Sequence, residues 1–118
     1  MSTLVQVTAG LAAVIHVLFF AAESLLWGKP AVTKTFGVRR DDVETLRLAM
    51  LNQGFYNLFL AGGVGYGIAT DSIAIVGTVS AIMVGAGLVL VLSKRSAALG
   101  AAIQGLPPLV ALVGIAVL

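Results

Sequence analysis

The feature that most constrains this chain is the distribution of its charged side chains, which leaves long apolar segments between short charged connections. Charged residues make up 10% of the 118 positions, whereas hydrophobic residues make up 59%. Four segments have about 20 residues or more, enough for a helix to cross a hydrocarbon core about 30 Å thick. The sequence therefore predicts an all-α polytopic membrane protein, a bundle of four transmembrane helices that forms a single domain over residues 1–118.

Breaker and capping residues indicate where these helices end. Gly28 ends the first one, and Asp41 with Glu44 three residues later has the spacing of a capping box that opens the second. Pro107 and Pro108 remove two amide donors from the fourth helix, so we expect a kink or a break there. The predicted helices cover residues 4–27, 42–69, 73–92 and 97–118.

The basic residues predict the orientation in the membrane. All seven lie in or beside the first and third connections, and none lies in the second connection or at either end. Because cytoplasmic loops are enriched in Lys and Arg, we expect these two connections in the cytoplasm and both termini outside. We expect the basic residues to contact the lipid bilayer and not nucleic acid, and the expected location is the bacterial cytoplasmic (inner) membrane.

Small residues recur at a spacing of four in three of the predicted helices. Transmembrane helices approach closely where such residues meet, because lipid does not drive apolar helices together as water does. The pattern predicts close helix contacts within the chain or in a homo-oligomer. The residues are Gly63 and Gly67, then Gly77, Ala81 and Gly85, and finally Ala101 and Gly105.

Two ionisable residues, His16 and Glu23, interrupt the first apolar segment. They are seven positions apart, so they share one helix face and lie about 10 Å apart along its axis. Ionisable side chains within a membrane span are costly and usually face the interior of the bundle. We therefore expect both side chains to point inward.

Polar side chains of the second and fourth helices fall in the same half of the membrane. With a rise of about 1.5 Å per residue, they lie roughly 10 to 18 Å from the cytoplasmic ends of their helices. We expect one polar pocket that extends from the cytoplasmic side to the middle of the bilayer. Its predicted ligand-binding residues are His16, Glu23, Asn52, Gln53, Tyr56, Asn57 and Gln104.

His16 and Glu23 are also the candidate catalytic pair. An imidazole exchanges protons near neutral pH, and a desolvated carboxyl group can act as its donor or acceptor. A structural role explains the same residues equally simply, since polar side chains often hydrogen-bond between membrane helices. In that interpretation Glu23 pairs with Arg47 or Lys29 near the interface.

Three functions follow from these alternatives. The first is a module that binds or transports a small lipophilic or weakly polar molecule. The second is an intramembrane, isomerase-like enzyme that moves protons on a lipid-like substrate, so whether the chain is an enzyme stays open. The third is an accessory or assembly subunit, in which the polar residues only fix the helix register. The sequence has no cysteine and one histidine, and we predict neither a metal site nor a cofactor.

Several strings of residues also carry a family resemblance. They are His16 with Glu23-Ser24-Leu25-Leu26-Trp27, Phe36-Gly37, Asn52-Gln53-Gly54-Phe55-Tyr56-Asn57 with Phe59-Leu60-Ala61-Gly62, and Gln104 through Pro107. Over almost its full length the chain resembles the small four-helix membrane family catalogued as domain of unknown function 1304. The resemblance implies an integral membrane protein without an established activity. Alanine follows the first proline in the family pattern, so Pro108 is a departure in the fourth helix.

Overall fold

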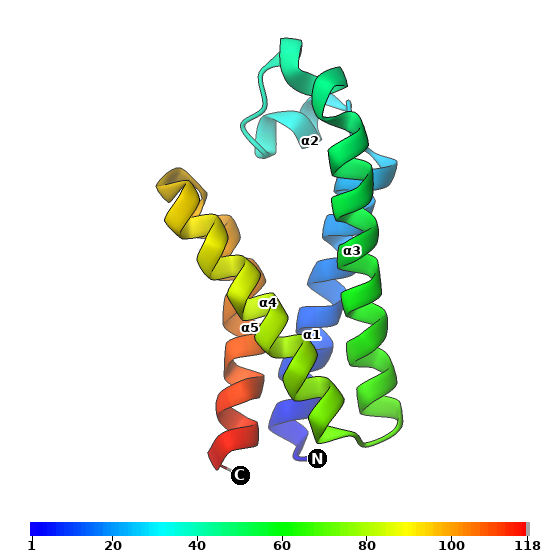
Figure 1. The fold of residues 1–118 in the computed structure, drawn as a ribbon, viewed down its shortest axis with the longest axis vertical. Coiled ribbons are helices and arrows are strands. Elements are labelled where there is room, and N and C mark those ends of the chain that lie inside the picture. Colours follow the sequence, from blue (N-terminus) through cyan, green and yellow to red (C-terminus); the bar gives the residue numbers. More distant parts are fainter. Residues whose placement is uncertain (118) are drawn as a thin grey trace.

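The computed structural model describes residues 1–117, which form helices and no strands (Figure 1). Four long helices run antiparallel in sequence order, and a short one lies in the first connection. The α-helices are α1 (Thr3–Phe20), α2 (Pro30–Thr35), α3 (Val43–Ala69), α4 (Ile73–Ser93) and α5 (Ala98–Val117). A π-helical turn, Ala21–Leu25, extends α1, and 3-10 turns at Arg40–Asp42 and Arg95–Ala97 precede α3 and α5. Leu118, the last residue of the predicted fourth helix, lies outside the described residues.

Among the described residues, three segments are long and apolar enough to cross a membrane: Thr3–Leu25, Ile73–Ser93 and Arg95–Val117. The chain is therefore a helical membrane protein, but the prediction of four such segments is wrong. The fourth long helix, α3, has 27 residues, so its length is sufficient. Its hydropathy is too low because Asn52, Gln53, Tyr56 and Asn57 lie within two turns of one another.

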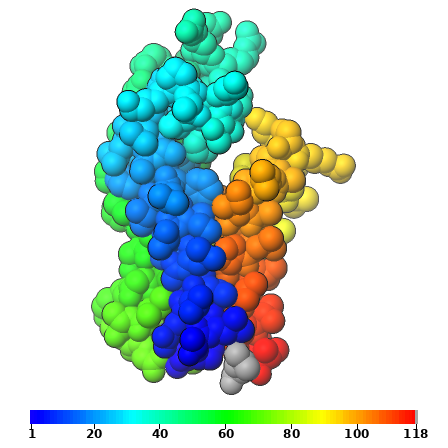
Figure 2. Space-filling model, turned by 180° about the vertical axis from the view of Figure 1, so that it is seen from behind, coloured from blue at the N-terminus to red at the C-terminus, as the bar shows by residue number. Residues whose placement is uncertain are grey.

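The four long helices surround a common core. α1 packs against α3 and α5, and α4 packs against the same two helices, so α1 and α4 lie diagonally across the bundle. α1 begins and α5 ends at the same end of the molecule (Figure 1). Toward the opposite end, α4 and α5 diverge from α1 and α3. Figure 2 shows the resulting recess from behind, between the α1–α2 connection and the α4–α5 turn.

Glycines allow the helices to approach closely within the chain. A Cβ atom at Gly54 of α3 would lie 1.9 Å from the hydroxyl oxygen of Ser24, and one at Gly67 would lie 2.8 Å from a methyl group of Val76. Both contacts are too short for any side chain larger than hydrogen. Gly54 therefore fixes the α1–α3 contact and Gly67 fixes the α3–α4 contact, as small residues do in membrane bundles.

The ends of two helices differ from the predictions. The first helix becomes π-helical at Ala21 and ends at Leu25, before the predicted breaker Gly28, which has a positive φ of 98°. The Asp41–Glu44 capping box does not form, because the segment before α3 is a 3-10 turn and the N-cap residue, Asp42, makes no side-chain capping bond. The carboxylate of Glu44 instead accepts hydrogen bonds from Arg47.

The two prolines do not break the last helix. α5 is continuous from Ala98 to Val117 and contains Pro107 and Pro108 in its interior. Each proline lacks an amide hydrogen, so the carbonyl groups one turn earlier lose their helical donors. Pro108 is buried within the bundle. α2, which begins at Pro30 in the first connection, was not predicted from the sequence.

Candidate functional site

Glu23 joins α1 to α3 through two short hydrogen bonds. Its side chain is only 2% exposed. One carboxylate oxygen accepts a bond of 2.5 Å from the side-chain amide of Gln53, and the other accepts a bond of 2.6 Å from that of Asn57. Each acceptor oxygen thus has its own donor, although neither donor carries a charge. We call these three residues the carboxylate clamp.

The local backbone places the clamp residues opposite one another. Glu23 lies in the middle of the π-helical turn, a feature that often marks functional positions in helices. Its neighbour Ser24 donates a hydrogen bond of 2.9 Å to the carbonyl oxygen of Leu51 on α3. Gly54 leaves room for this approach, and Gln53 and Asn57 are one helical turn apart on the α3 face that meets α1.

His16 lies deeper in the same inward-facing stripe of α1. The side chain is 0% exposed. Its Nδ1 atom lies 2.8 Å from the carbonyl oxygen of Ala12, one turn earlier. A carbonyl oxygen can only accept, so Nδ1 carries the hydrogen and donates this bond. The other ring nitrogen, Nε2, is buried and has no hydrogen-bond partner among residues 1–117.

Ser80 on α4 has the second buried polar atom without a partner. Its side chain is also 0% exposed, and its hydroxyl oxygen makes no hydrogen bond in the described structure. Ser80 and His16 thus occupy the core-facing stripes of the two diagonal helices, α4 and α1. Ser80 is not among the site residues predicted from the sequence. The sequence signal for Ser80 is a hydroxyl side chain in a very apolar helix. This signal is weak, because serine also packs well between membrane helices without any role in binding.

The other predicted site residues lie outside the clamp. Asn52 is exposed on α3, and Tyr56 is 68% exposed. Gln104 is half-buried on α5. The described residues show no hydrogen bond from any of these three side chains. The structure thus brings Glu23, Gln53 and Asn57 into one network, with His16 separate from it and no hydrogen bond between His16 and Glu23.

One groove of the molecule is apolar and does not coincide with the predicted pocket. Its volume is about 610 Å³, and it runs between α1 and α3. None of the seven predicted site residues lines it. The lining residues are Ala13, Val14, Val17, Leu18, Leu58, Phe59, Ala61 and Gly62.

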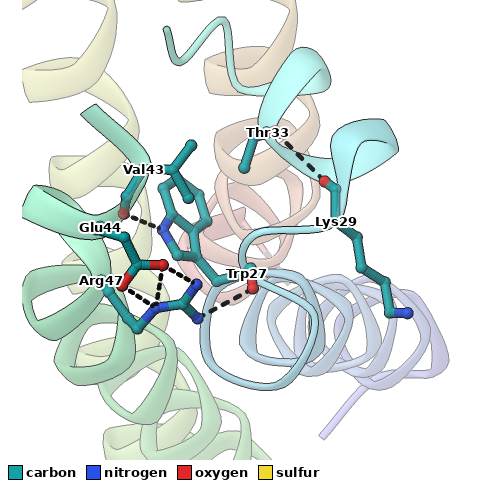
Figure 3. A network of polar contacts seen from close by, with 6 residues as sticks. All are labelled: Trp27, Lys29, Thr33, Val43, Glu44 and Arg47. Atoms are coloured by element: carbon teal, nitrogen blue, oxygen red, sulfur yellow. Dashed lines mark hydrogen bonds and ion pairs between the residues drawn. The ribbon is translucent and has the colours of Figure 1, made fainter. Parts of the chain in front are cut away.

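A separate network fixes the end of α1 to the start of α3 (Figure 3). The indole nitrogen of the buried Trp27 donates a hydrogen bond of 2.9 Å to the carbonyl oxygen of Val43, and Arg47 donates one of 3.1 Å to the carbonyl oxygen of Trp27. Arg47 also pairs with Glu44 at 2.6 Å, and this hydrogen bond lowers the pKa of Glu44. The predicted pairing of Glu23 with Arg47 or Lys29 is therefore wrong: Arg47 is used here, and Lys29 points away from the network.

The described residues contain no group of three histidine, cysteine or acidic side chains placed to hold a metal ion. The arrangement offers instead one buried carboxylate with two amide donors, one buried imidazole acceptor and one buried hydroxyl group. Chemically, such groups can hold a neutral polar group by hydrogen bonds within a largely apolar interior.

Comparison with known proteins gives the family of the chain but not an activity. No curated protein and no solved structure matches it. The family described as "Protein of unknown function (DUF1304)" matches residues 10–116, which include the carboxylate clamp, His16 and Ser80. The match covers nearly the whole sequence and agrees with the resemblance seen in the sequence. The chain therefore belongs to the DUF1304 family.

Proposed function

We propose that this protein binds a small lipophilic molecule inside its helix bundle and that His16 makes the main polar contact with it. The observation that carries the proposal is the Nε2 atom of His16, which is buried and lacks a partner. A buried acceptor without a donor costs about 1–3 kcal/mol. Native proteins rarely keep such a group unless water, a ligand or another partner uses it.

The diverging helices leave an opening at one end of the bundle. α4 and α5 separate from α1 and α3 toward the end where α2 lies, which leaves the recess seen in Figure 2. The carboxylate clamp holds α1 and α3 together on one side of this opening. A ligand that enters the recess can separate the α4–α5 pair further without breaking the clamp. Gln104, half-buried on α5, is then available for a second polar contact.

The proposed orientation follows from the basic connections. Lys29, Lys34, Arg39 and Arg40 lie in the connection between α1 and α3, and Lys94 and Arg95 lie between α4 and α5. We place this end in the cytoplasm and the ends of α1 and α5 outside, in a bacterial cytoplasmic (inner) membrane.

Binding is favoured over intramembrane proton transfer by the contacts of the two titratable residues. Glu23 is fully engaged by Gln53 and Asn57, and His16 is engaged by Ala12 through Nδ1. A proton relay needs a hydrogen-bonded path between donor and acceptor. The clamp accordingly serves to hold α1 on α3, and His16 offers an unpaired polar atom to a ligand.

Native mass spectrometry of protein released from membranes tests this proposal. We expect a bound lipophilic species on the parent chain. His16→Phe keeps a ring of similar size but removes both nitrogens, and it should lose that species. His16→Gln places an amide oxygen near the position of Nε2 and should retain part of it. Helicity and melting temperature of each variant are measured alongside, so that a loss of fold is not read as a loss of ligand.

The result that would contradict the proposal is equally specific. A parent chain without any bound species, or a species carried equally by the parent and by folded His16→Phe, would show that His16 does not hold a ligand. Asn52→Leu is the matched control, because Asn52 is exposed and outside the clamp. It should leave the bound species unchanged.

A second candidate function, an accessory subunit or a homo-oligomer, is favoured by the outer face of α3. Asn52 and Tyr56 are exposed on this face, and the hydrocarbon of a bilayer offers their side chains no hydrogen-bond partner. A protein partner, including a second copy, would supply one. Cross-linking in the membrane tests this: Asn52→Leu combined with Tyr56→Phe should abolish a specific cross-linked species, and its persistence would count against this face.

A further inference from the structure

Basic side chains at one end of the molecule form a second candidate site, which the binding proposal for His16 does not use. We infer that this site binds the phosphate group of one anionic phospholipid, between Lys34 and Arg39 of the α1–α3 connection and Lys94 of the α4–α5 turn. The inference goes beyond the general attraction between basic connections and a bilayer, because it names a defined site for one lipid. It stands independently of whether His16 holds a ligand.

A contact between the two connections brings these cations together. The Nζ atom of Lys94 lies 3.9 Å from the position that a Cβ atom on Gly37 would occupy. Gly37 follows α2 with a positive φ of 68°, and its amide donates a hydrogen bond of 3.0 Å to the carbonyl oxygen of Lys34. Arg39 comes two positions later, so its Cα atom is within about 8 Å of that of Gly37. Three exposed basic residues thus surround one exposed glycine.

These three cations have no carboxylate partner among residues 1–117. The ion pairs in that part of the chain join Arg47 to Glu44 and the N-terminal amino group to Asp71. Asp41 and Asp42 are the other acidic residues of the α1–α3 connection, and neither forms an ion pair there. The three charges are therefore available to an external anion. Phosphate suits them because its oxygens accept charge-assisted hydrogen bonds from Lys and Arg.

Apolar side chains beside the cations indicate a lipid and not a soluble phosphate. Leu92, two positions before Lys94, is 82% exposed, and Leu99 in the first turn of α5 is 75% exposed. They are the two most exposed large hydrophobic side chains of residues 1–117. A phospholipid carries acyl chains next to its phosphate, so it can cover these leucines and contact the cations at once. Binding of this kind gains from both apolar area and charge.

The location of the site lets the lipid link two parts of the bundle. The α1–α3 connection, which carries Lys34 and Arg39, bounds one side of the recess, and the α4–α5 turn, which carries Lys94, bounds the other (Figure 2). A phosphate group held by all three residues joins these two sides. The bound lipid thereby ties the α4–α5 pair to the connection at the end where the helices diverge (Figure 1).

Native mass spectrometry of the full chain with added probes tests the inference. The first probe is phosphatidylglycerol, which is anionic. The second is phosphatidylcholine with the same acyl chains, whose choline group cancels the phosphate charge. The third is glycerol 3-phosphate, which has the phosphate but no acyl chains. The variants are Lys34→Gln, Arg39→Gln and Lys94→Gln, with Lys94→Arg as the variant that keeps the charge.

Lys29→Gln is the matched control. It removes one positive charge from the same connection, but Lys29 lies before the first residue of α2 and Gly37 lies beyond the last one. Six helical residues, about 9 Å, separate the two positions. At physiological ionic strength the effect of a charge at this distance is largely screened. The helicity of every variant is measured alongside, so that a loss of fold is not read as a loss of lipid.

We expect one phosphatidylglycerol per chain, bound at least about tenfold more tightly than phosphatidylcholine. Lys34→Gln, Arg39→Gln and Lys94→Gln should each weaken it by about fivefold, the effect of one cation near a headgroup. Lys94→Arg should retain most of the binding, and Lys29→Gln should change it by less than about twofold. His16→Phe should leave it unchanged, because His16 is buried away from the connections.

Four results would overturn the inference. They are the absence of bound phosphatidylglycerol, equal binding of the two lipids, equal losses in Lys29→Gln and Lys94→Gln, and displacement of the lipid by glycerol 3-phosphate. The third would show that only overall charge matters, and the fourth that the site takes a soluble phosphate. None of them bears on the lipophilic species expected at His16, which is identified by its own mass and by its loss in His16→Phe.

Discussion

The carboxylate clamp makes a quantitative prediction about the stability of the α1–α3 contact. Asn57→Leu removes the donor of the 2.6 Å bond to Glu23 and leaves that carboxylate oxygen buried without a partner. Hydrogen bonds to charged groups contribute about 1.5–3 kcal/mol in soluble proteins, whereas interhelical bonds in membranes average about 0.6 and reach about 1.7 kcal/mol. The short distance and the buried acceptor place this bond at the upper end of the membrane range. We expect a loss of about 1–2 kcal/mol.

A double-mutant cycle isolates this interaction from the effect of changing each residue alone. Glu23→Leu, Asn57→Leu and the double variant are compared with the parent by unfolding in mixed micelles with increasing sodium dodecyl sulfate, followed by circular dichroism. We expect a coupling energy of at least about 1 kcal/mol, because residues in one hydrogen-bond network are not additive. Replacing Glu23, Gln53 and Asn57 together by Leu should cost less than the three single losses added, since no buried polar group is then left unpaired.

The control lies on the same helix. Asn52→Leu changes an exposed amide that makes no bond to Glu23, so it should alter the unfolding free energy by no more than about 0.5 kcal/mol. A coupling energy between Glu23 and Asn57 below about 0.3 kcal/mol would refute the clamp. The same conclusion would follow if Asn52→Leu destabilised the protein as much as Asn57→Leu does.

Three further predictions use the same unfolding assay. Gly54→Ala should lower the unfolding free energy by about 1–3 kcal/mol, because the new methyl group clashes with Ser24. Gly65→Ala should be neutral or stabilising by up to about 1 kcal/mol, because nothing lies within 4 Å of its methyl group. Equal effects of the two substitutions would contradict the packing described. Trp27→Phe should cost about 1 kcal/mol by removing the bond from the indole to the start of α3, and an unchanged midpoint would count against that bond. Ser80→Ala should leave the ligand-free protein as stable or more stable by up to about 1 kcal/mol, because it removes an unpaired buried hydroxyl group. A marked loss of stability would instead reveal a partner for Ser80.

The helical class, the membrane character and the family could be predicted because they depend on properties that act over many residues. Apolar segments bounded by charged connections leave few alternatives to membrane helices. The number of membrane-spanning segments could not be predicted from these properties. The polar residues of α3 interrupt its apolar face, and in the structure two of them, Gln53 and Asn57, are paired with Glu23 instead of being directed at lipid. Their pairing depends on a partner 30 or 34 residues away in the chain, which local patterning does not specify.

Candidate polar residues could be chosen from the sequence, but their arrangement in the bundle could not be predicted. Helical spacing correctly places His16 and Glu23 on one buried face of α1. Helical spacing cannot show that Asn52 and Tyr56 point away from the clamp. Which of two adjacent helix faces meets α1 is known only once the neighbouring helices are placed. Ser80 could not be predicted for a related reason. It stands out because its buried hydroxyl group makes no hydrogen bond, and this is visible only in the structure.

The central claim is that His16 presents a bare acceptor to the interior of the bundle, and the ¹⁵N spectrum of this single histidine in lipid bilayers tests it most directly. The spectrum separates a protonated ring nitrogen from an unprotonated one without reference to any ligand. The account predicts a hydrogen on Nδ1, which donates to Ala12, and a lone pair on Nε2. A hydrogen on Nε2, in either the other neutral tautomer or the doubly protonated ring, would contradict it.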